Sequence, residues 1–511
     1  MKMSNERYQL HWITAIISVL KTLKEMIIPI ILLIFVNGVN DTGKWYWDYL
    51  IFIIFGVSLI IFLITGFIKW KRYVYWFEDN ELRIEYGLFV KKKRYIPFER
   101  IQSLDYVEGL LHRPFKLVKV KVETAGSTAS LKAEAELTAI TKEAAEKIEE
   151  RFAEAKRQQV PVSTDIETEE EYLTVQEVPK SIARHIFTMT TQDLFVLATT
   201  SGGIGLILSG IFVFLSQFSD VLPIESIYNE VSVVIKSGLI LISLIVLVGL
   251  FIIWCISVLM TFLAYYNFSV QLEGENIVIT RGLIEKRRVT IPLKRVQSVR
   301  IVESPFRQIF GYATVIIDNA GGGIEGEGVK IKLLPLVRRG KIQAILKELF
   351  PELITDAPTH KLPSRGKRFY YRIQYVWTVP LVIGLSYYFY PYGLLSLIII
   401  PLVIALGVWR HYSGAYLLME NQLTLRFRGI SLNTVFMKKK QIQSMQIRQN
   451  YFHKKRQVAT IDAAVKSGQL AFYAEVKHMD EQEAKRIFDW YKPKAHQVAV
   501  SHVEIEESEE D

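Results

Sequence analysis

Long charge-free stretches alternate with densely charged blocks along the chain. The longest stretches cover residues 49–68, 194–215, 238–262 and 373–409, and a shorter one has its core at 26–36. A helix needs about 20 residues to cross about 30 Å of hydrocarbon. The stretch at 373–409 is long enough for two helices and has Pro391 at its middle. This pattern predicts six transmembrane helices arranged in three hairpins.

Basic residues are unevenly divided between the two ends of these stretches. Residues 37–48 and 216–237 contain one basic residue each, whereas Lys69, Lys71 and Arg72 directly follow the second stretch. Lys and Arg accumulate in the cytoplasmic loops of membrane proteins. We therefore expect a multi-pass protein of the plasma membrane with both termini and all three large polar blocks in the cytoplasm.

The polar blocks repeat one motif, I-P-x-x-R-[IV]-Q-S. It is complete at residues 96–103 and 291–298, and a looser copy stands at 437–444. In the first two copies the motif glutamine follows a glycine, Gly87 or Gly282, after the same 15 residues. Glycine is suited to the turn expected there because it adopts positive φ at little cost. The matched spacing indicates a diverged internal repeat with three copies.

Each copy has the same pattern of apolar positions. Alternating segments such as Leu82, Ile84 and Tyr86 predict half-buried strands. A segment with helical spacing follows at 137–152, 336–350 and 479–490. The pattern predicts three cytoplasmic PH-like α+β domains, each an antiparallel sheet or partial barrel with a C-terminal helix.

The expected organisation combines these domains with the three hairpins. Its parts are an N-terminal segment with hairpin 1 (1–72), PH-like domain 1 (73–158), an acidic linker (159–193), hairpin 2 (194–265), PH-like domain 2 (266–351), a linker (352–372), hairpin 3 (373–411), PH-like domain 3 (412–492) and an acidic tail (493–511).

With these motifs and repeats, the whole chain resembles the YdbS/YdbT-type family of bacterial membrane proteins, which carry PH-like domains after paired transmembrane helices. The resemblance implies a bacterial plasma-membrane location. It also implies a smaller, YdbS-like companion protein with the same domain type, and hence a hetero-oligomer. The third copy departs from the motif because Gln441 replaces the arginine. Any function tied to that arginine is therefore in doubt in copy three.

Basic clusters occupy the same place in the first two copies. They comprise Lys91, Lys92, Lys93 and Arg94 in copy one, and Lys286, Arg287 and Arg288 in copy two. One interpretation is a solvated face with the charge expected on the cytoplasmic side. The other is contact with anionic lipid headgroups, which attract basic segments by about 1 kcal/mol per residue near the surface. The clusters lack the interleaved aromatic residues of a nucleic-acid surface, so we expect no nucleic-acid partner.

The motif residues themselves admit a structural role or a binding role. They are Pro97, Arg100 and Gln102 in copy one, Pro292, Arg295 and Gln297 in copy two, and Gln443 in copy three. Residues kept in every copy of a repeat usually serve the fold. We therefore favour a structural role, in which the arginine and glutamine anchor a strand to the adjacent turn.

Composition narrows the function further. The net charge of +10 favours anionic partners. The single cysteine, Cys255, excludes an intramolecular disulfide and a multi-cysteine metal site, and the histidines lack metal-binding spacings. We therefore expect no metal, no cofactor and no catalytic residues, and hence no enzymatic activity.

Two functions remain. The first is a non-enzymatic membrane protein whose PH-like domains form an interaction platform, and the resemblance connects such proteins with envelope maintenance or resistance to antimicrobial peptides (bacteriocins). The alternative is a subunit of a transporter or exporter. The chain contains no nucleotide-binding motif, so this alternative would require a partner ATPase.

Overall fold

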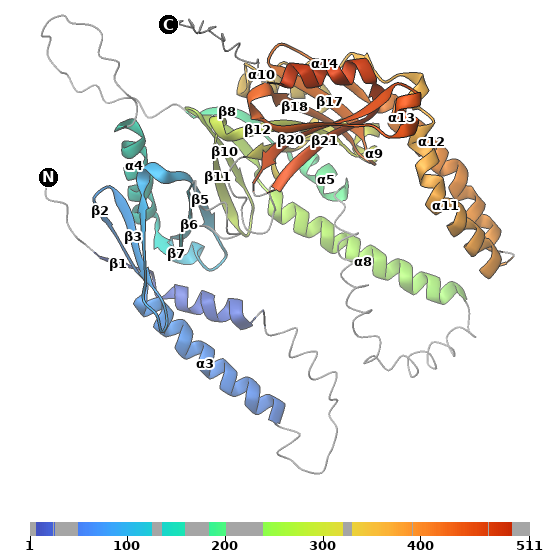
Figure 1. The fold of residues 1–511 in the computed structure, drawn as a ribbon. Coiled ribbons are helices and arrows are strands. Elements are labelled where there is room, and N and C mark those ends of the chain that lie inside the picture. Colours follow the sequence, from blue (N-terminus) through green and yellow to red (C-terminus); the bar gives the residue numbers. More distant parts are fainter. Residues whose placement is uncertain are drawn as a thin grey trace, which may run out of the picture. The chain divides into compact units, whose positions relative to one another are not determined.

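The computed structural model describes residues 7–23, 25, 50–124, 135–158, 183–200, 239–319, 330–390, 392–468 and 470–492. The chain divides into two compact units, one made mainly of Met1–Thr355 and the other mainly of Asp356–Lys466 with Ala471–Asp511. The first unit contains two PH-like domains and the second contains one (Figure 1). Each domain combines a four-stranded layer, a three-stranded layer and a C-terminal helix.

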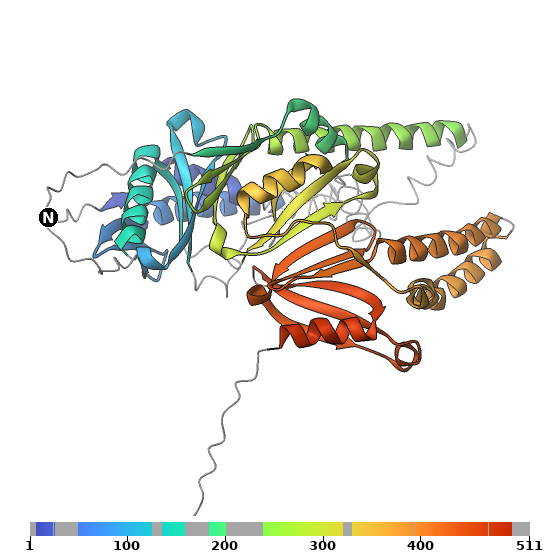
Figure 2. The ribbon, with the colours of Figure 1, turned by 90° about the horizontal axis from the view of Figure 1, so that it is seen from above.

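The first PH-like domain has a core between its two strand layers and its helix. Leu82, Ile96, Val120 and Leu137 are almost fully buried there, and Ile148 of the helix packs against them. The four-stranded layer has the order β1 (Tyr8–Gln9), β2 (Val74–Glu78), β3 (Glu81–Tyr86) and β4 (Lys92–Pro97). The three-stranded layer consists of β5 (Ile101–Glu108), β6 (Leu117–Thr124) and β7 (Ala135–Thr141), and helix α4 (Lys142–Gln158) follows (Figure 2).

The second PH-like domain repeats this plan. Its four-stranded layer has the order β8 (Arg184–Thr188), β9 (Ser269–Glu273), β10 (Asn276–Arg281) and β11 (Lys286–Pro292). Its other layer consists of β12 (Val296–Glu303), β13 (Tyr312–Asn319) and β14 (Lys330–Arg338), followed by helix α10 (Arg339–Leu349). Ile342, Leu346 and Leu349 on α10 are buried at helical spacing, which gives the helix one apolar face.

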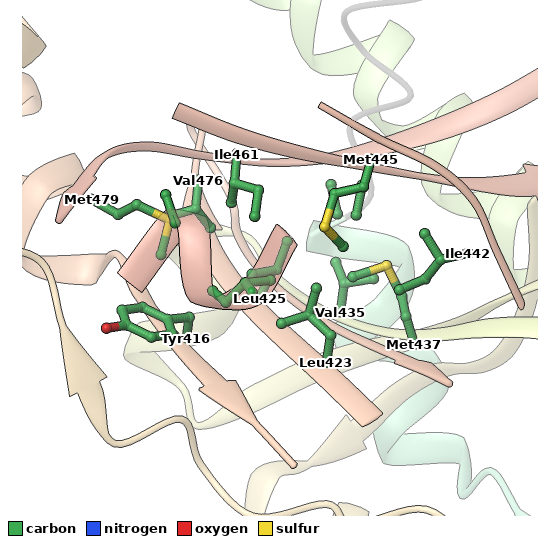
Figure 3. Packing of buried hydrophobic residues seen from close by; sticks show 14 of the residues in the cluster. Tyr416, Leu423, Leu425, Val435, Met437, Ile442, Met445, Ile461, Val476 and Met479 are labelled. Atoms are coloured by element: carbon green, nitrogen blue, oxygen red, sulfur yellow. The ribbon is translucent and has the colours of Figure 1, made fainter. Parts of the chain in front are cut away.

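The third PH-like domain is built in the same way. Its strands are β15 (His360–Lys361), β16 (Ala415–Leu418), β17 (Gln422–Arg428) and β18 (Leu432–Lys438), then β19 (Ile442–Arg448), β20 (Val458–Ser467) and β21 (Leu470–Asp480). Helix α14 (Glu481–Tyr491) closes the domain and contributes Ala484 and Ile487 to the core. Met437, Met445 and Met479 point into this core among branched aliphatic side chains (Figure 3).

In every copy an apolar helical segment lies in the sequence between the first and second strands of the four-stranded layer. Antiparallel pairing joins β1 to β2, β8 to β9 and β15 to β16. In the third copy helices α11 (Phe369–Tyr388) and α12 (Ile399–Ser413) lie side by side between these strands (Figures 1 and 2). The helical segment is thus an insertion whose two ends are held together by one strand pair. The boundaries expected from the sequence omit this first strand, which is short or lies within a linker.

The prediction of six transmembrane helices is wrong. Among the described residues, one helical segment, Gly393–Ser413, is long and apolar enough to cross a membrane, by length and composition only. The described strands form four sheets, which belong to the PH-like domains. The predicted stretch at 26–36 lies outside the described residues, as does 201–215 of the stretch at 194–215. A shorter apolar helix, Ile13–Leu23, precedes the predicted stretch at 26–36.

The prediction fails because the absence of charge does not ensure a long apolar helix. Helix α11 carries five tyrosines together with Arg372, Gln374 and Pro380, which lower its mean hydropathy. Helix α3 (Leu50–Arg72) ends on three basic residues. Within helix α8 (Leu239–Tyr265), the apolar part whose side chains are described is the shorter segment Phe251–Tyr265.

Candidate interaction site at the junction of β5 and β11

Strand β5 of the first domain pairs with strand β11 of the second. The pairing is antiparallel and places Lys286 opposite Glu108, Arg287 opposite Val107 and Arg288 opposite Tyr106. It joins the three-stranded layer of domain 1 and the four-stranded layer of domain 2 into one seven-stranded sheet, with β5 and β11 at its centre. The basic cluster of copy two therefore lies in a contact between PH-like domains.

Charged side chains surround this junction. Arg288 Nη2 lies 3.0 Å from Glu273 Oε2 on β9 and 3.6 Å from Glu149 Oε1 on α4. Lys142 Nζ lies 2.7 Å from Glu108 Oε1. All of these residues except Glu273 line a cavity of about 290 Å³, together with Tyr106 and Lys286. Opposite charges thus meet across the line where the two domains join.

Asp105 is the most deeply buried acid of the junction, with 4% of its surface exposed. Burial is the main cause that raises the pKa of Asp105 to about 8, and the nearby Glu123 carboxylate contributes to this rise. The backbone N–H of Thr290 on β11 donates a hydrogen bond to Asp105, and Lys121 and Arg287 are the nearby cations that oppose the shift. The junction therefore contains a carboxyl group whose pKa lies well above its ordinary value.

The motif arginine of copy two also faces the first domain. Arg295 is half-buried at the end of the 3-10 helix η4 (Leu293–Arg295), and burial lowers its pKa to about 10. The Glu123 carboxylate of β6 opposes this shift, which places the two charges near each other. Its counterpart in copy one, Arg100, is exposed. The same motif residue thus has two environments, one beside another PH-like domain and one exposed.

The basic cluster of copy one is arranged differently from that of copy two. Lys91 Nζ and Lys93 Nζ lie 2.6 Å and 3.3 Å from the carboxylate of Glu85, and Lys92 is exposed. Arg94 is half-buried, with its guanidinium 6.0 Å from the ring centre of Tyr86. Strand β4 pairs with β3 on one side and is the last of the described strands in its sheet.

The motif glutamine occupies a β-bulge in all three copies. The register shifts between Ile101 and Ser103, between Val296 and Ser298, and between Ile442 and Ser444, so Gln102, Gln297 and Gln443 are the extra residues. Gln297 Nε2 donates a hydrogen bond to the backbone oxygen of Arg295 at 3.2 Å. Gln443 is exposed, and the side chain of Gln102 lies outside the described residues.

The motif prolines begin short 3-10 helices. Pro97 precedes η1 (Phe98–Arg100) and Pro292 precedes η4, each in an extended conformation. The prolines therefore stand at the end of β4 and β11, where the chain turns into the bulged strand. Bulges bend a strand and increase its twist, which turns the chain from one layer of the domain to the other.

Sequence reasoning missed the junction and the acids within it. Asp105 stands in the segment Leu104-Asp105-Tyr106, whose alternation suggests a solvent-facing acid, and its burial depends on a strand from another domain. The acidic Glu108 at the end of β5, together with the basic residues of β11, was a signal that could have suggested the pairing of these two strands. Within the described residues no group of three or more His, Cys, Asp or Glu side chains is placed to hold a metal ion.

Comparisons with known proteins agree with this architecture. The family model described as bacterial PH domain matches residues 27–156, 204–350 and 377–495, which confirms the predicted three-fold repeat. The chain is 35% identical over 497 residues to the UPF0699 transmembrane protein YdbT of Bacillus subtilis (strain 168), covering 96% of this chain and 99% of the relative. It is 28% identical over 117 residues to the UPF0699 transmembrane protein YdbS of the same organism, covering 22% of this chain and 74% of the relative.

Proposed function

Because the chain is a membrane protein that belongs to the family carrying the bacterial PH domain, we propose that it is a membrane-anchored assembly scaffold without enzymatic activity. Its PH-like domains bind each other and partner proteins through the edges of their sheets. The observation that carries this proposal is the pairing of β5 with β11. That pairing places the basic cluster of copy two in a contact between domains.

The proposal extends to a companion protein. The smaller relative named YdbS matches part of this chain, so a second protein with the same domain type exists in the family. Sheet edges provide main-chain hydrogen bonds for such a partner, and the side chains on the edge provide specificity. We infer a hetero-oligomer between this chain and a smaller PH-domain protein.

The domains are proposed to face the cytoplasm. Lys69, Lys71 and Arg72 end α3 directly before the first domain, and basic residues accumulate on the cytoplasmic side. Tyr390 is 75% exposed and lies between α11 and α12, away from these residues in the sequence. In a Cys255→Ser background, Tyr390→Cys should react with an impermeant maleimide in intact cells. Lys92→Cys should react only after permeabilisation, and the reverse pattern would overturn the orientation.

A role in envelope maintenance or in resistance to antimicrobial peptides is the proposed physiological outcome. It is supported by the family resemblance. Deletion of the gene should increase the susceptibility of the cell to such peptides, and the intact gene should restore resistance. Unchanged susceptibility would argue against this role and would leave the scaffold proposal standing.

Purification of the tagged full-length chain from its own membrane in mild detergent tests the scaffold function. We expect a second protein at a fixed ratio and no nucleotide hydrolysis by the complex. Co-purification of an ATPase would instead support a transporter subunit. A chain that elutes alone at every protein concentration tested would contradict the scaffold.

A further inference from the structure

The first domain contains an edge that the second domain uses for binding. Strand β4 is the repeat equivalent of β11, because Gly87 and Gly282 begin the same turn and the same spacing follows. On this alignment Lys91, Lys92 and Lys93 correspond to Lys286, Arg287 and Arg288. Among the described residues no strand pairs with the outer side of β4, whereas β11 pairs there with β5.

The basic side chains of β4 are more exposed than those of β11, which pairs with β5. Arg287 and Arg288 are half-buried at the junction, whereas Lys92 and Lys93 are exposed. Tyr95 on β4 is 51% exposed, and Phe89 in the preceding turn is 91% exposed. The outer side of β4 thus presents aromatic and basic side chains beside an unpaired backbone edge.

Lysines on an edge strand often prevent pairing with other chains. That explanation does not suffice here, because β11 is equally basic and is paired. What β11 meets is acidic: Glu108 stands opposite Lys286, and Glu149 lies beside Arg288. A basic edge of this type therefore selects a strand with carboxylates.

We propose that the outer edge of β4 binds, by antiparallel strand pairing, the β5-type strand of a PH-like domain in another protein, with a carboxylate opposite Lys91. This inference rests on the proposed scaffold function and specifies the edge and the partner's chemistry. Within this chain β5 is already paired with β11. Strand β19 and the residue after it have Arg448 and Gln449 where β5 has Val107 and Glu108, so β19 would bring a positive charge against the lysines. Charge complementarity thus favours a separate protein over β19 of a second copy.

The exposed Arg100 supports the same assignment. Its counterpart Arg295 lies near Glu123 of the first domain, whereas Arg100 is exposed. A partner that docks on β4 in the manner of domain 1 on β11 would supply an acidic residue beside Arg100. The recognition surface therefore extends from Lys91 on the strand to Arg100 after it.

Disulfide trapping on the full-length protein in detergent tests the proposal. The probe is a peptide of residues 101–108, the chain's own β5 sequence, carrying Val107→Cys, which in the known register faces the Arg287 position. The protein carries Cys255→Ser and Lys92→Cys. Opposed side chains in a strand pair have Cβ atoms about 4.5–5.5 Å apart, close to the spacing of a disulfide. The matched control is Lys341→Cys, at an exposed lysine on α10.

We expect Lys92→Cys to be trapped about fivefold more than Lys341→Cys, which corresponds to about 1 kcal/mol of specific pairing. Glu108→Lys in the peptide should abolish the difference. Equal trapping at both cysteines would overturn the proposal. So would disulfide-linked dimers of the Lys92→Cys protein in place of peptide adducts, because the occupant would then be a second copy.

Two further outcomes separate this proposal from its alternatives. In the first, vesicles of anionic phospholipid bind the wild-type protein but not a variant in which Lys91–Arg94 are neutralised, and the peptide is trapped equally at both cysteines. This result would assign the cluster to lipid and overturn the proposal. Lys91→Glu with Lys93→Glu should release a co-purified partner. If that partner stays bound at the wild-type level, the scaffold function holds, but the partner does not bind the edge of β4.

Discussion

Lys286 on β11 lies directly opposite Glu108 on β5, on the line where two PH-like domains share one sheet. A second carboxylate at this line, that of Glu149 on α4, lies 3.6 Å from Arg288. Main-chain pairing alone would join any two edges, whereas these charges make this pair of edges specific. The junction thus shows how the first two domains of this chain can select each other.

Reversing the charge of Arg288 should weaken the junction. Arg288→Glu places a third carboxylate beside Glu149 and Glu273, and the expected loss is about 1 kcal/mol, since the pair is partly exposed. Hydrogen exchange of the backbone at 106–108 and 286–288 would measure it. Adding Glu149→Arg should recover part of the protection in a double-mutant cycle.

Lys294→Glu is the matched control. Lys294 forms an ion pair with Glu275 at 2.7 Å, but both side chains are largely exposed and lie outside the strand pairing. Exchange at 106–108 and 286–288 should therefore stay at the wild-type rate. Equal effects of the two reversals would mean that net charge, and not the contact of Arg288, governs the junction.

The stability of the junction should depend on the protonation of Asp105. Its pKa in the folded protein, about 8, lies above the ordinary value of 3.8. The stability gained from the neutral form is therefore fully present below pH 3.8 and is lost as pH rises through about 8. Asp105→Asn should flatten this dependence and slow exchange of the Thr290 amide at pH 8. Exposed Asp489→Asn serves as control, and an unchanged pH profile in Asp105→Asn would contradict the assignment.

The repeat and its strand pattern could be predicted from the sequence because they depend on local spacing. The alternation Leu82, Ile84 and the matched distances after Gly87 and Gly282 are properties of short segments. The bulges at Gln102 and Gln297 could not be predicted, because one extra residue in a strand is defined only by its partner strand. The spacing shared by the first two copies indicated a structural role for the motif, but it did not show that the role is a bulge.

The junction and the membrane segments could not be predicted for a different reason. Pairing of β5 with β11 joins residues about 180 positions apart, and neither strand differs in its own pattern from one that faces solvent. The number of spans was inferred from charge-free length, but Tyr-rich α11 shows that such a run need not be apolar enough. Burial of Asp105 also follows from the pairing and has no local signal.

Two glycines should resist substitution. Gly87 has φ of 135° and Gly282 has φ of 104°, and a Cβ at either position would lie 2.0 Å from a carbonyl oxygen, that of Val90 or Glu285. Replacing either by Ala should destabilise its domain by about 1–3 kcal/mol, which hydrogen exchange in β4 or β11 would detect. Gly429→Ala is the control in copy three, because nothing lies within 4 Å of its Cβ position. A neutral Gly282→Ala would show that the turn is not fixed by this contact.

The third domain should lose stability in mild acid because two histidines are buried in it. The rings of His453 and His478 are 4.8 Å apart, and both pack on Phe369. Burial is the main cause that lowers the pKa of His478 to about 3, and the neighbouring His453 contributes to this fall. The folded domain therefore holds His478 neutral, whereas the unfolded chain takes up a proton near pH 6.5. The corresponding stability is present above pH 6.5 and is lost as pH falls toward 3.

Replacement of His478 tests this pH dependence. His478 has φ of 53°, a conformation that Asn tolerates better than most residues, so His478→Asn removes the imidazole and keeps the backbone. Hydrogen exchange in β20 and β21 should accelerate between pH 7 and pH 5 in the wild type and change less in the variant. Exposed His360→Asn should behave as the wild type. If His478→Asn retains the full acceleration, the acid sensitivity has another origin, and the buried pair of rings does not act as the titrating group.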